Sequence, residues 1–130
     1  MPMITNGAIE VPQGANVPVT RTPITSIPIG DTLAKAWLTV KRNQTDADGA
    51  AVFQKTILPG FVSGQGQITD TGGAGGSMRF DLQQADTVLI LPGFTYLYDI
   101  KVRTVAGIVS PIESGVMRCA GVGQITIASA

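Results

Sequence analysis

The sequence predicts an all-β protein that folds as one domain, and three observations indicate this class. Sixteen glycines and eight prolines are spread along the 130 residues, so turns should be frequent and helices scarce. Several short runs alternate apolar and polar side chains, as half-buried strands do. Turn residues separate these runs, and no linker of distinct composition interrupts them. The length suits a single domain.

The first thirty residues predict either an extended arm or an edge strand. Prolines recur there between β-branched residues, at Pro12, Pro18, Pro23 and Pro28. Proline has no backbone N–H to donate, so it is excluded from the middle of a sheet. We therefore divide the chain into an extended, proline-rich N-terminal arm, residues 1–30, and a β-sandwich domain, residues 31–130. A chain that lacks residues 1–28 is then expected to fold.

Residues 33–42 form the first strong predicted strand. Ala34, Ala36, Leu38 and Val40 share one face, and Trp37 shares the other with lysines and threonine. Trp37 therefore falls on the more polar face, where it covers a second layer or meets a partner.

Residues 95–104 give the clearest alternation in the chain. Tyr96, Tyr98, Ile100 and Val102 point one way, and Leu97 is the one apolar residue on the polar face. A turn at Ala106–Gly107 leads into residues 108–120, which predicts a hairpin.

Further strands are predicted near Gln54, in residues 61–69, around Met78–Leu82 and in residues 124–128, with one helical turn within residues 45–53. About seven short strands separated by turns favour a single immunoglobulin-like β-sandwich. A β-barrel would give a similar pattern.

Charge and hydropathy exclude several function classes. Nine basic and nine acidic residues cancel, so the positive surface of a nucleic-acid-binding protein is missing. No apolar run approaches the roughly 20 residues that span a bilayer, and no secretory signal is evident. Cys119 has no cysteine partner within the chain and is expected to be a buried, inert thiol in a protein made in a reducing cytoplasm.

The residues predict no enzyme, no cofactor, no metal site and no small-molecule substrate. Histidine is absent, which removes the most frequent general base and metal ligand. Asp46-Ala47-Asp48-Gly49 resembles the start of a calcium loop, but its later ligands are missing. Acid pairs such as Asp81 with Asp86, or Asp99 with Glu113, would have to meet across strands to act as a catalytic pair.

Three stretches resemble a group of small bacteriophage tail and baseplate modules with an immunoglobulin-like fold. They are AWLTVKRNQTDADGAAVFQKTI (residues 36–57), ADTVLILPGFTYLYDIKV (85–102) and GIVSPIESGVMRC (107–119). The resemblance covers roughly residues 31–120, whereas the proline-spaced segment before it does not match the group.

The resemblance implies a non-enzymatic virion structural protein of the tail, baseplate or fibre-attachment region. Its partners would be other virion proteins, with a homo-oligomer in the particle and assembly in the host cytoplasm, and without nucleic acid or membrane. The closest alternative is a capsid decoration protein that clamps major capsid subunits. Another is a host-surface carbohydrate-binding adhesin, which predicts a groove lined by exposed Trp37 and tyrosines.

We expect the N-terminal arm to bind a neighbouring subunit, and we expect a second contact from the indole of Trp37 on the more polar face. The residues predicted to bind a partner are Val11, Pro12, Val17, Pro18, Val19, Pro23, Ile24, Ile27, Pro28 and Trp37.

Overall fold

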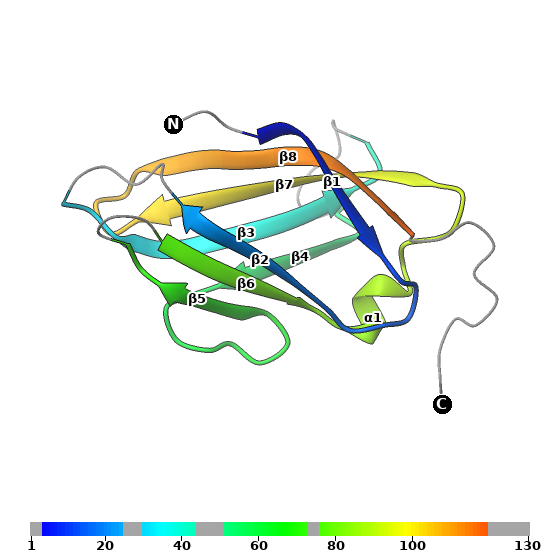
Figure 1. Ribbon diagram of the computed structural model, residues 1–130, viewed down its shortest axis with the longest axis horizontal. Helices are drawn as coiled ribbons and strands as arrows, with labels where there is room; N and C mark the ends of the chain where they lie inside the picture. The colour runs from blue at the N-terminus through cyan, green and yellow to red at the C-terminus, as the bar shows by residue number, and fades with distance from the viewer. Residues whose placement is uncertain (1–3, 25–29, 44–50, 73–75, 120–130) are drawn as a thin grey trace.

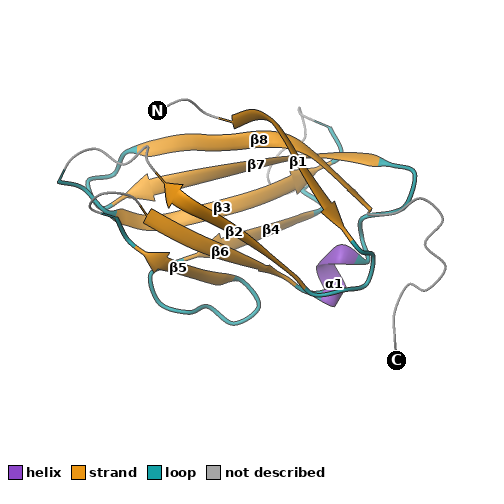
Figure 2. Cartoon of the chain, viewed as in Figure 1, coloured by secondary structure: helices purple, strands orange, loops and turns teal. Residues whose placement is uncertain are grey.

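Two β-sheets packed face to face form the protein, seen in a computed structural model that describes residues 4–24, 30–43, 51–72 and 76–119 (Figures 1 and 2). The five-stranded sheet has the order β1 (Ile4–Val11), β8 (Val109–Cys119), β7 (Thr95–Thr104), β3 (Leu33–Lys41), β4 (Phe53–Ile57). The three-stranded sheet has the order β2 (Val17–Ile24), β6 (Gly76–Leu82), β5 (Gly66–Asp70). A single-turn helix, α1 (Gln84–Thr87), connects β6 to β7. The predicted all-β sandwich is therefore confirmed at the level of two packed sheets.

The core lies between the sheets and follows the alternation seen in the sequence. On β7 the buried side chains are Tyr96, Tyr98, Ile100 and Val102, as predicted, and Leu97 is 36% exposed on the opposite face. On β6 the buried side chains include Met78, Phe80 and Leu82. Each strand directs every second side chain into the space between the sheets. The inner faces of the two sheets therefore form one apolar layer, and their outer faces are mainly polar.

Three local hairpins, β3–β4, β5–β6 and β7–β8, pair antiparallel. In the last of these the chain reverses at Gly107, whose φ of 94° is left-handed, and the N–H of Thr104 donates to the carbonyl of Ile108 at 2.9 Å. The predicted β7–β8 hairpin is confirmed. The connections β1–β2, β2–β3, β4–β5 and β6–β7 pass from one sheet to the other.

The N-terminal residues are strands of the sandwich, and the prediction of an arm separate from the domain is wrong for residues 4–24. β1 pairs parallel with β8, and β2 pairs antiparallel with β6. Each is the edge strand of its sheet, as the alternative interpretation of the prolines held. Val11 is fully buried and Val19 is 5% exposed, so this segment contributes to the common core. Removing residues 1–28 would take one strand from each sheet.

The strand predicted over residues 61–69 is shorter than expected. The chain turns at residues 62–66, where the N–H groups of Gln65 and Gly66 donate to the carbonyl of Val62. Gly66 has a φ of 131°, and a Cβ there would lie 2.0 Å from the carbonyl oxygen of Arg79. Only glycine fits this position, and β5 begins from it. The strand predicted at residues 124–128 and most of the helical turn predicted in 45–53 lie outside the described residues.

Substitution of Val19 tests whether the N-terminal segment belongs to the core. Val19→Ala should lower the free energy of unfolding by about 1–2 kcal/mol, because it removes buried methyl groups and leaves a cavity. Thr20→Ala, at the exposed neighbouring position on the same strand, is the matched control and should change it by less than about 0.5 kcal/mol. Urea denaturation of both variants measures the difference, and equal stabilities would mean that β2 does not pack as described.

Candidate functional site

A buried ion pair joins the two sheets at Arg21 and Glu113. Arg21, on β2, donates from Nε to Oε1 of Glu113 at 2.6 Å and from Nη2 to Oε2 at 2.7 Å. Glu113, on β8, is 3% exposed, and the hydroxyl of Tyr98 on β7 also donates to its Oε2. Two carboxylate oxygens thus receive three donors from two other strands, which satisfies the buried charge.

The pKa values of these three groups follow from the same contacts. Burial by itself raises the pKa of Glu113, but the hydrogen bonds from Arg21 and Tyr98 and the charge of Arg21 outweigh it, so the pKa is lowered. Burial, together with the carboxylate of Glu113, raises the pKa of Tyr98. The hydrogen bond to Glu113 raises the pKa of Arg21. At neutral pH the cluster is therefore a carboxylate, a guanidinium and a neutral phenol.

Two glycines allow β1 to lie directly over this cluster. A Cβ at Gly7 would lie 2.1 Å from the hydroxyl oxygen of Tyr98, and a Cβ at Gly115 would lie 1.9 Å from the carbonyl oxygen of Gly7. Any side chain at either position would push β1 away from β8. The backbone of β1 therefore lies against the cluster, and the ion pair joins the two sheets.

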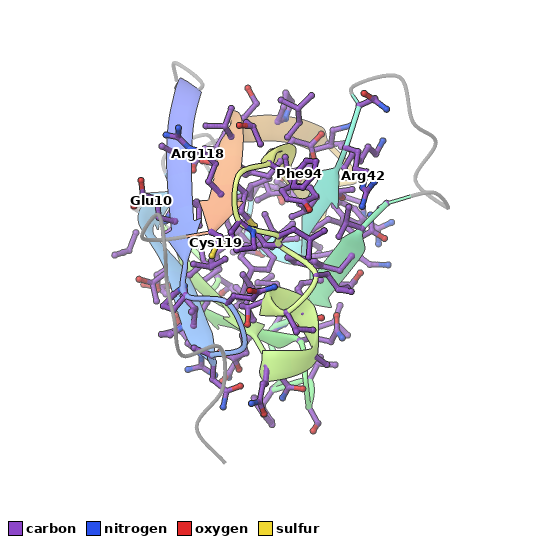
Figure 3. The ribbon with its side chains drawn as sticks, turned by 90° about the vertical axis from the view of Figure 1, so that its right-hand side faces the viewer. Glu10, Arg42, Phe94, Arg118 and Cys119 are labelled. Atoms are coloured by element: carbon purple, nitrogen blue, oxygen red, sulfur yellow. The ribbon has the colours of Figure 1, made fainter. Side chains whose placement is uncertain are left out.

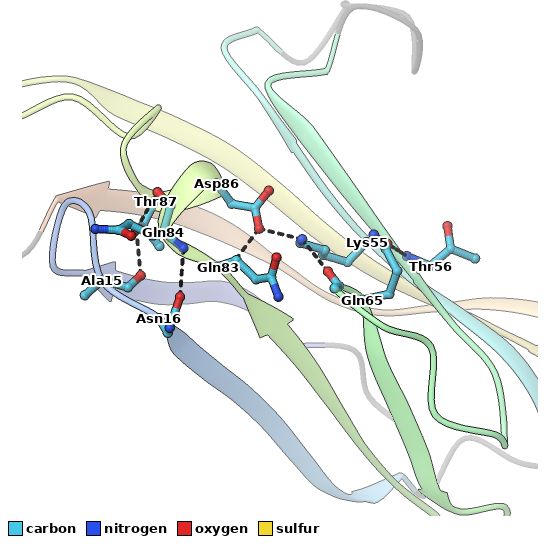
Figure 4. A network of polar contacts seen from close by, with 10 residues as sticks. Ala15, Asn16, Lys55, Thr56, Gln65, Gln83, Gln84, Asp86 and Thr87 are labelled. Carbon is cyan, nitrogen blue, oxygen red and sulfur yellow. Dashed lines mark hydrogen bonds and ion pairs between the residues drawn. The ribbon is translucent and has the colours of Figure 1, made fainter.

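A second ion pair fixes α1 against the hairpin that contains β4. The Nζ of Lys55, a residue only 4% exposed, lies 2.5 Å from Oδ2 of Asp86 and donates to the carbonyl of Gly64 at 2.7 Å (Figure 4). Asp86 also accepts the N–H of Gln83 at 2.8 Å, which caps the helical turn.

The other side of α1 holds the turn between β1 and β2. The hydroxyl of Thr87 donates to the carbonyl of Ala15 at 2.7 Å, and Oδ1 of Asn16 accepts the N–H of Gln84 at 2.8 Å (Figure 4). Gln13 donates to the carbonyl of Val88 at 3.0 Å. The single helical turn therefore positions the crossing between the two edge strands.

The acid pairs that would have suited catalysis do not form. Asp81 binds Arg79 at 2.6 Å, and Asp86 binds Lys55. Asp99 lies on the outer face of its sheet, whereas Glu113 points into the interior. Within the described part of the chain, no three His, Cys, Asp or Glu side chains gather as metal ligands. Asp46 and Asp48 lie outside the described residues.

A depression, which we call the cross-strand trough, crosses the outer face of the five-stranded sheet. Its floor is a row of short polar side chains that are register neighbours on four strands: Gln54, Thr39, Asp99 and Ser114. One wall is formed by Lys41, Leu97, Val116 and Ala8, and the other by Trp37 and Lys101. Two adjoining cavities of about 500 and 230 Å³ make up the trough and share Thr39, Lys41 and Asp99.

Exposed apolar side chains gather at the two ends of β7. Before its first residue lie Val88, Leu89, Leu91 and Phe94, between 37% and 60% exposed. After its last residue lie Val105, Ile108 and Val109, between 47% and 70% exposed. We call these sets the α1-end patch and the hairpin-end patch. Figure 3 looks onto the first, where Phe94 lies between Arg118 and Arg42.

The residues predicted to bind a partner have different locations. Val11 and Val19 are in the core, and Val17 packs against it. Pro12, directly after β1, and Pro18, in β2, are exposed. Pro23 and Ile24 belong to β2, with no description of their side chains, and Ile27 and Pro28 lie outside the described residues. The buried positions cannot contact a neighbour while the sandwich is intact.

The aromatic side chains do not form the groove that the adhesin alternative predicted. Tyr96 and Tyr98 are 1% and 3% exposed. Trp37 alone among these three reaches the outer face, where the Nζ of Lys35 lies 5.3 Å from its ring centre. A buried thiol was predicted for Cys119, which is half-buried and packs against the core.

Comparison with known proteins gives no relative: no family model, no curated protein and no solved structure matches the chain. Among the described residues, none of the helices has the length and apolarity needed to cross a bilayer.

Removing the carboxylate of Glu113 should destabilise the fold in a pH-dependent way. Glu113→Gln leaves Arg21 without its charged partner, and we expect the free energy of unfolding at pH 7 to fall by about 2–3 kcal/mol. This loss is at the low end of the range for breaking a buried ion pair, because Arg21 is partly exposed to solvent. The folded pKa of Glu113 lies below its ordinary value of 4.5. The stabilisation is therefore complete above pH 4.5 and disappears as the pH falls through the folded pKa.

Urea denaturation at pH 7 and pH 3 measures this change, with Asp81→Asn as the control for a partly exposed ion pair. The gap between the unmodified chain and Glu113→Gln should narrow at the lower pH, and Asp81→Asn should cost less than about 1 kcal/mol. A gap that stays constant with pH would show that the carboxylate is not the stabilising group.

Proposed function

We propose that the chain is a non-enzymatic structural module of a bacteriophage particle, in the tail, baseplate or fibre-attachment region, which docks onto neighbouring subunits. The observation that carries the proposal is the pair of exposed apolar patches at opposite ends of β7. The resemblance of residues 36–57, 85–102 and 107–119 to tail and baseplate modules supplies the bacteriophage context.

The α1-end patch has the composition of a contact surface. Val88, Leu89, Leu91 and Phe94 fall within seven successive positions, and all remain substantially exposed. Apolar side chains scattered singly over a surface are ordinary, whereas a contiguous set with charged residues beside it marks an interaction site. In the view of Figure 3, Phe94 lies between Arg118 and Arg42 at this end of the molecule.

The hairpin-end patch lies at the other end of the same strand. Ten residues of β7 separate Phe94 from Val105, which corresponds to about 30 Å along an extended strand. A subunit with apolar surfaces at both ends can contact one neighbour at each. Repetition of such a contact closes into a ring or continues as a stack, which are the forms that particle components take.

An immunoglobulin-like arrangement fits this proposal. In that fold one sheet contains strands B, E and D, and the other contains strands G, F and C. Here β2-β6-β5 corresponds to B-E-D and β8-β7-β3 to G-F-C, with β4 added as C′. At the start of β7 the hydroxyl of Tyr96 accepts the N–H of Leu91, five residues upstream, at 3.1 Å. This contact has the form of the tyrosine corner at the E–F connection.

The lack of catalysis is part of the same proposal. The sequence contains no histidine, and its acids at Asp81, Asp86 and Glu113 are held in ion pairs. Groups fixed in this way are suited to stabilising a scaffold, since a general acid or base must be poised to exchange a proton with a substrate.

Self-association of the purified chain tests the docking role. Phe94→Ser and Ile108→Ser should each shift the chain from oligomer to monomer in size-exclusion chromatography with light scattering, because each removes apolar area from one patch. Phe61→Ser is the matched control: Phe61 is 62% exposed but lies in the β4–β5 connection. A monomeric unmodified chain, or equal effects of all three variants, would contradict docking through the ends of β7.

Fractionation of phage particles tests the location. Mass spectrometry of separated tails and heads should find the chain with the tails. Its presence on tailless heads would overturn the tail assignment and favour the capsid decoration alternative.

A further inference from the structure

The floor of the cross-strand trough offers hydrogen-bonding groups of several kinds in one row. Thr39 and Ser114 carry hydroxyls, Gln54 an amide and Asp99 a carboxylate. The Nε2 of Gln54 donates to Oγ1 of Thr39 at 2.8 Å, which orients both groups. Closely spaced donors and acceptors of this kind pair with the vicinal hydroxyls of a sugar, each of which both donates and accepts.

The walls give the trough a positive charge. Lys101 lines one wall, and Lys35 and Arg103 are register neighbours beside Trp37 on the same face. Asp99 is the only acid among the described residues that line the trough. Elsewhere, Arg21, Lys55 and Arg79 lie in ion pairs with acids of the scaffold. Among the described residues, the outer face beside the trough therefore carries more basic than acidic side chains, which favours an anionic ligand.

The direction of the trough argues against a peptide strand as the occupant. The lining residues come from β1, β8, β7, β3 and β4 in turn, so the trough runs across the strands. A peptide that adds to a sheet lies along an edge strand and pairs with its backbone. Within a sheet face the backbone groups are already paired, and only side chains can recognise a ligand that lies across them.

The half-exposed indole of Trp37 adds an apolar ring surface to one wall of the trough. A ring of this kind packs against the C–H face of a pyranose, while the polar floor takes its hydroxyls. From the polar floor, the basic side chains beside Trp37, the indole in one wall and the direction across the strands, we infer that the cross-strand trough binds an acidic oligosaccharide whose sugar rings carry carboxylates. This site lies on a sheet face and meets the hairpin-end patch only at Val109. Trp37 and Lys101 belong to neither apolar patch, so substituting them tests the trough separately from the docking role proposed above.

Isothermal titration of the full chain with tetragalacturonate tests the inference, with maltotetraose as the neutral probe of the same length. The acidic probe should bind and the neutral probe should bind at least about tenfold more weakly, and added salt should weaken the acidic probe. Chemical-shift changes in amide NMR spectra should map to Thr39, Asp99 and Ser114.

Two substitutions and one control locate the site. Trp37→Ala and Lys101→Gln should each weaken tetragalacturonate binding by about tenfold, whereas Arg79→Gln, on the outer face of the other sheet, should leave it unchanged. Lys101 is exposed, so its substitution tests the site even if Trp37→Ala unfolds the chain. Neither substitution should alter self-association, which distinguishes this test from that of the docking role.

Four results would overturn the inference. They are no binding of tetragalacturonate, equal binding of the neutral probe, equal binding of tetraglutamate as an acidic peptide, or shift changes confined to residues outside the trough.

Discussion

The carboxylate of Glu113 is the constraint on which the arrangement of the two sheets depends. It lies in the interior on β8, and removal of a charge from water is costly unless donors replace the water. Arg21 supplies two of these donors from β2, in the opposite sheet, and Tyr98 supplies the third from β7. The pairing of β1 with β8 then requires Gly7 over the same cluster. One buried charge thus fixes the position of both N-terminal strands relative to the last hairpin.

The edges of the sheets are protected by local features of the sequence. Pro18 and Pro23 remove donors from β2, an edge strand that a second chain would otherwise extend. On β4, an edge strand of the five-stranded sheet, the N–H of Thr56 donates to the side-chain oxygen of Gln65 at 2.9 Å. Because the backbone edges are blunted in this way, association through side-chain surfaces becomes the more favourable route to assembly.

The low content of charged residues explains why the surface is divided into distinct regions. Only 14% of the residues are charged, and within the described part of the chain Arg21, Lys55 and Arg79 bind acids of the scaffold. The other described basic side chains concentrate on the outer face of the five-stranded sheet and around its ends. Apolar side chains therefore remain exposed at the two ends of β7. A surface divided into one polar face and two apolar ends is suited to separate contacts with different partners. A uniformly polar surface would be suited to a monomer surrounded by water.

The sequence by itself determined the strands whose two faces differ in polarity. β7 has the bounds predicted from its alternation, and its buried face carries Tyr96 and Tyr98 as expected, because the period of a strand is set by local geometry. In the apolar run Val88-Leu89-Ile90-Leu91, by contrast, no alternation indicates which side chain is buried, and the structure buries Ile90 alone.

Tertiary structure decided everything that depends on pairing between distant residues. Pro12 and Pro18 are compatible with either an arm or an edge strand. The N-terminal segment forms edge strands because it pairs with β8 and β6, which lie about 60 or more residues away in sequence. No local sequence pattern encodes such long-range pairing. The ion pair of Arg21 with Glu113 joins residues 92 positions apart. The cross-strand trough exists only because the register of four strands aligns Gln54, Thr39, Asp99 and Ser114. A shift of one residue in any pair would turn those side chains to the other face.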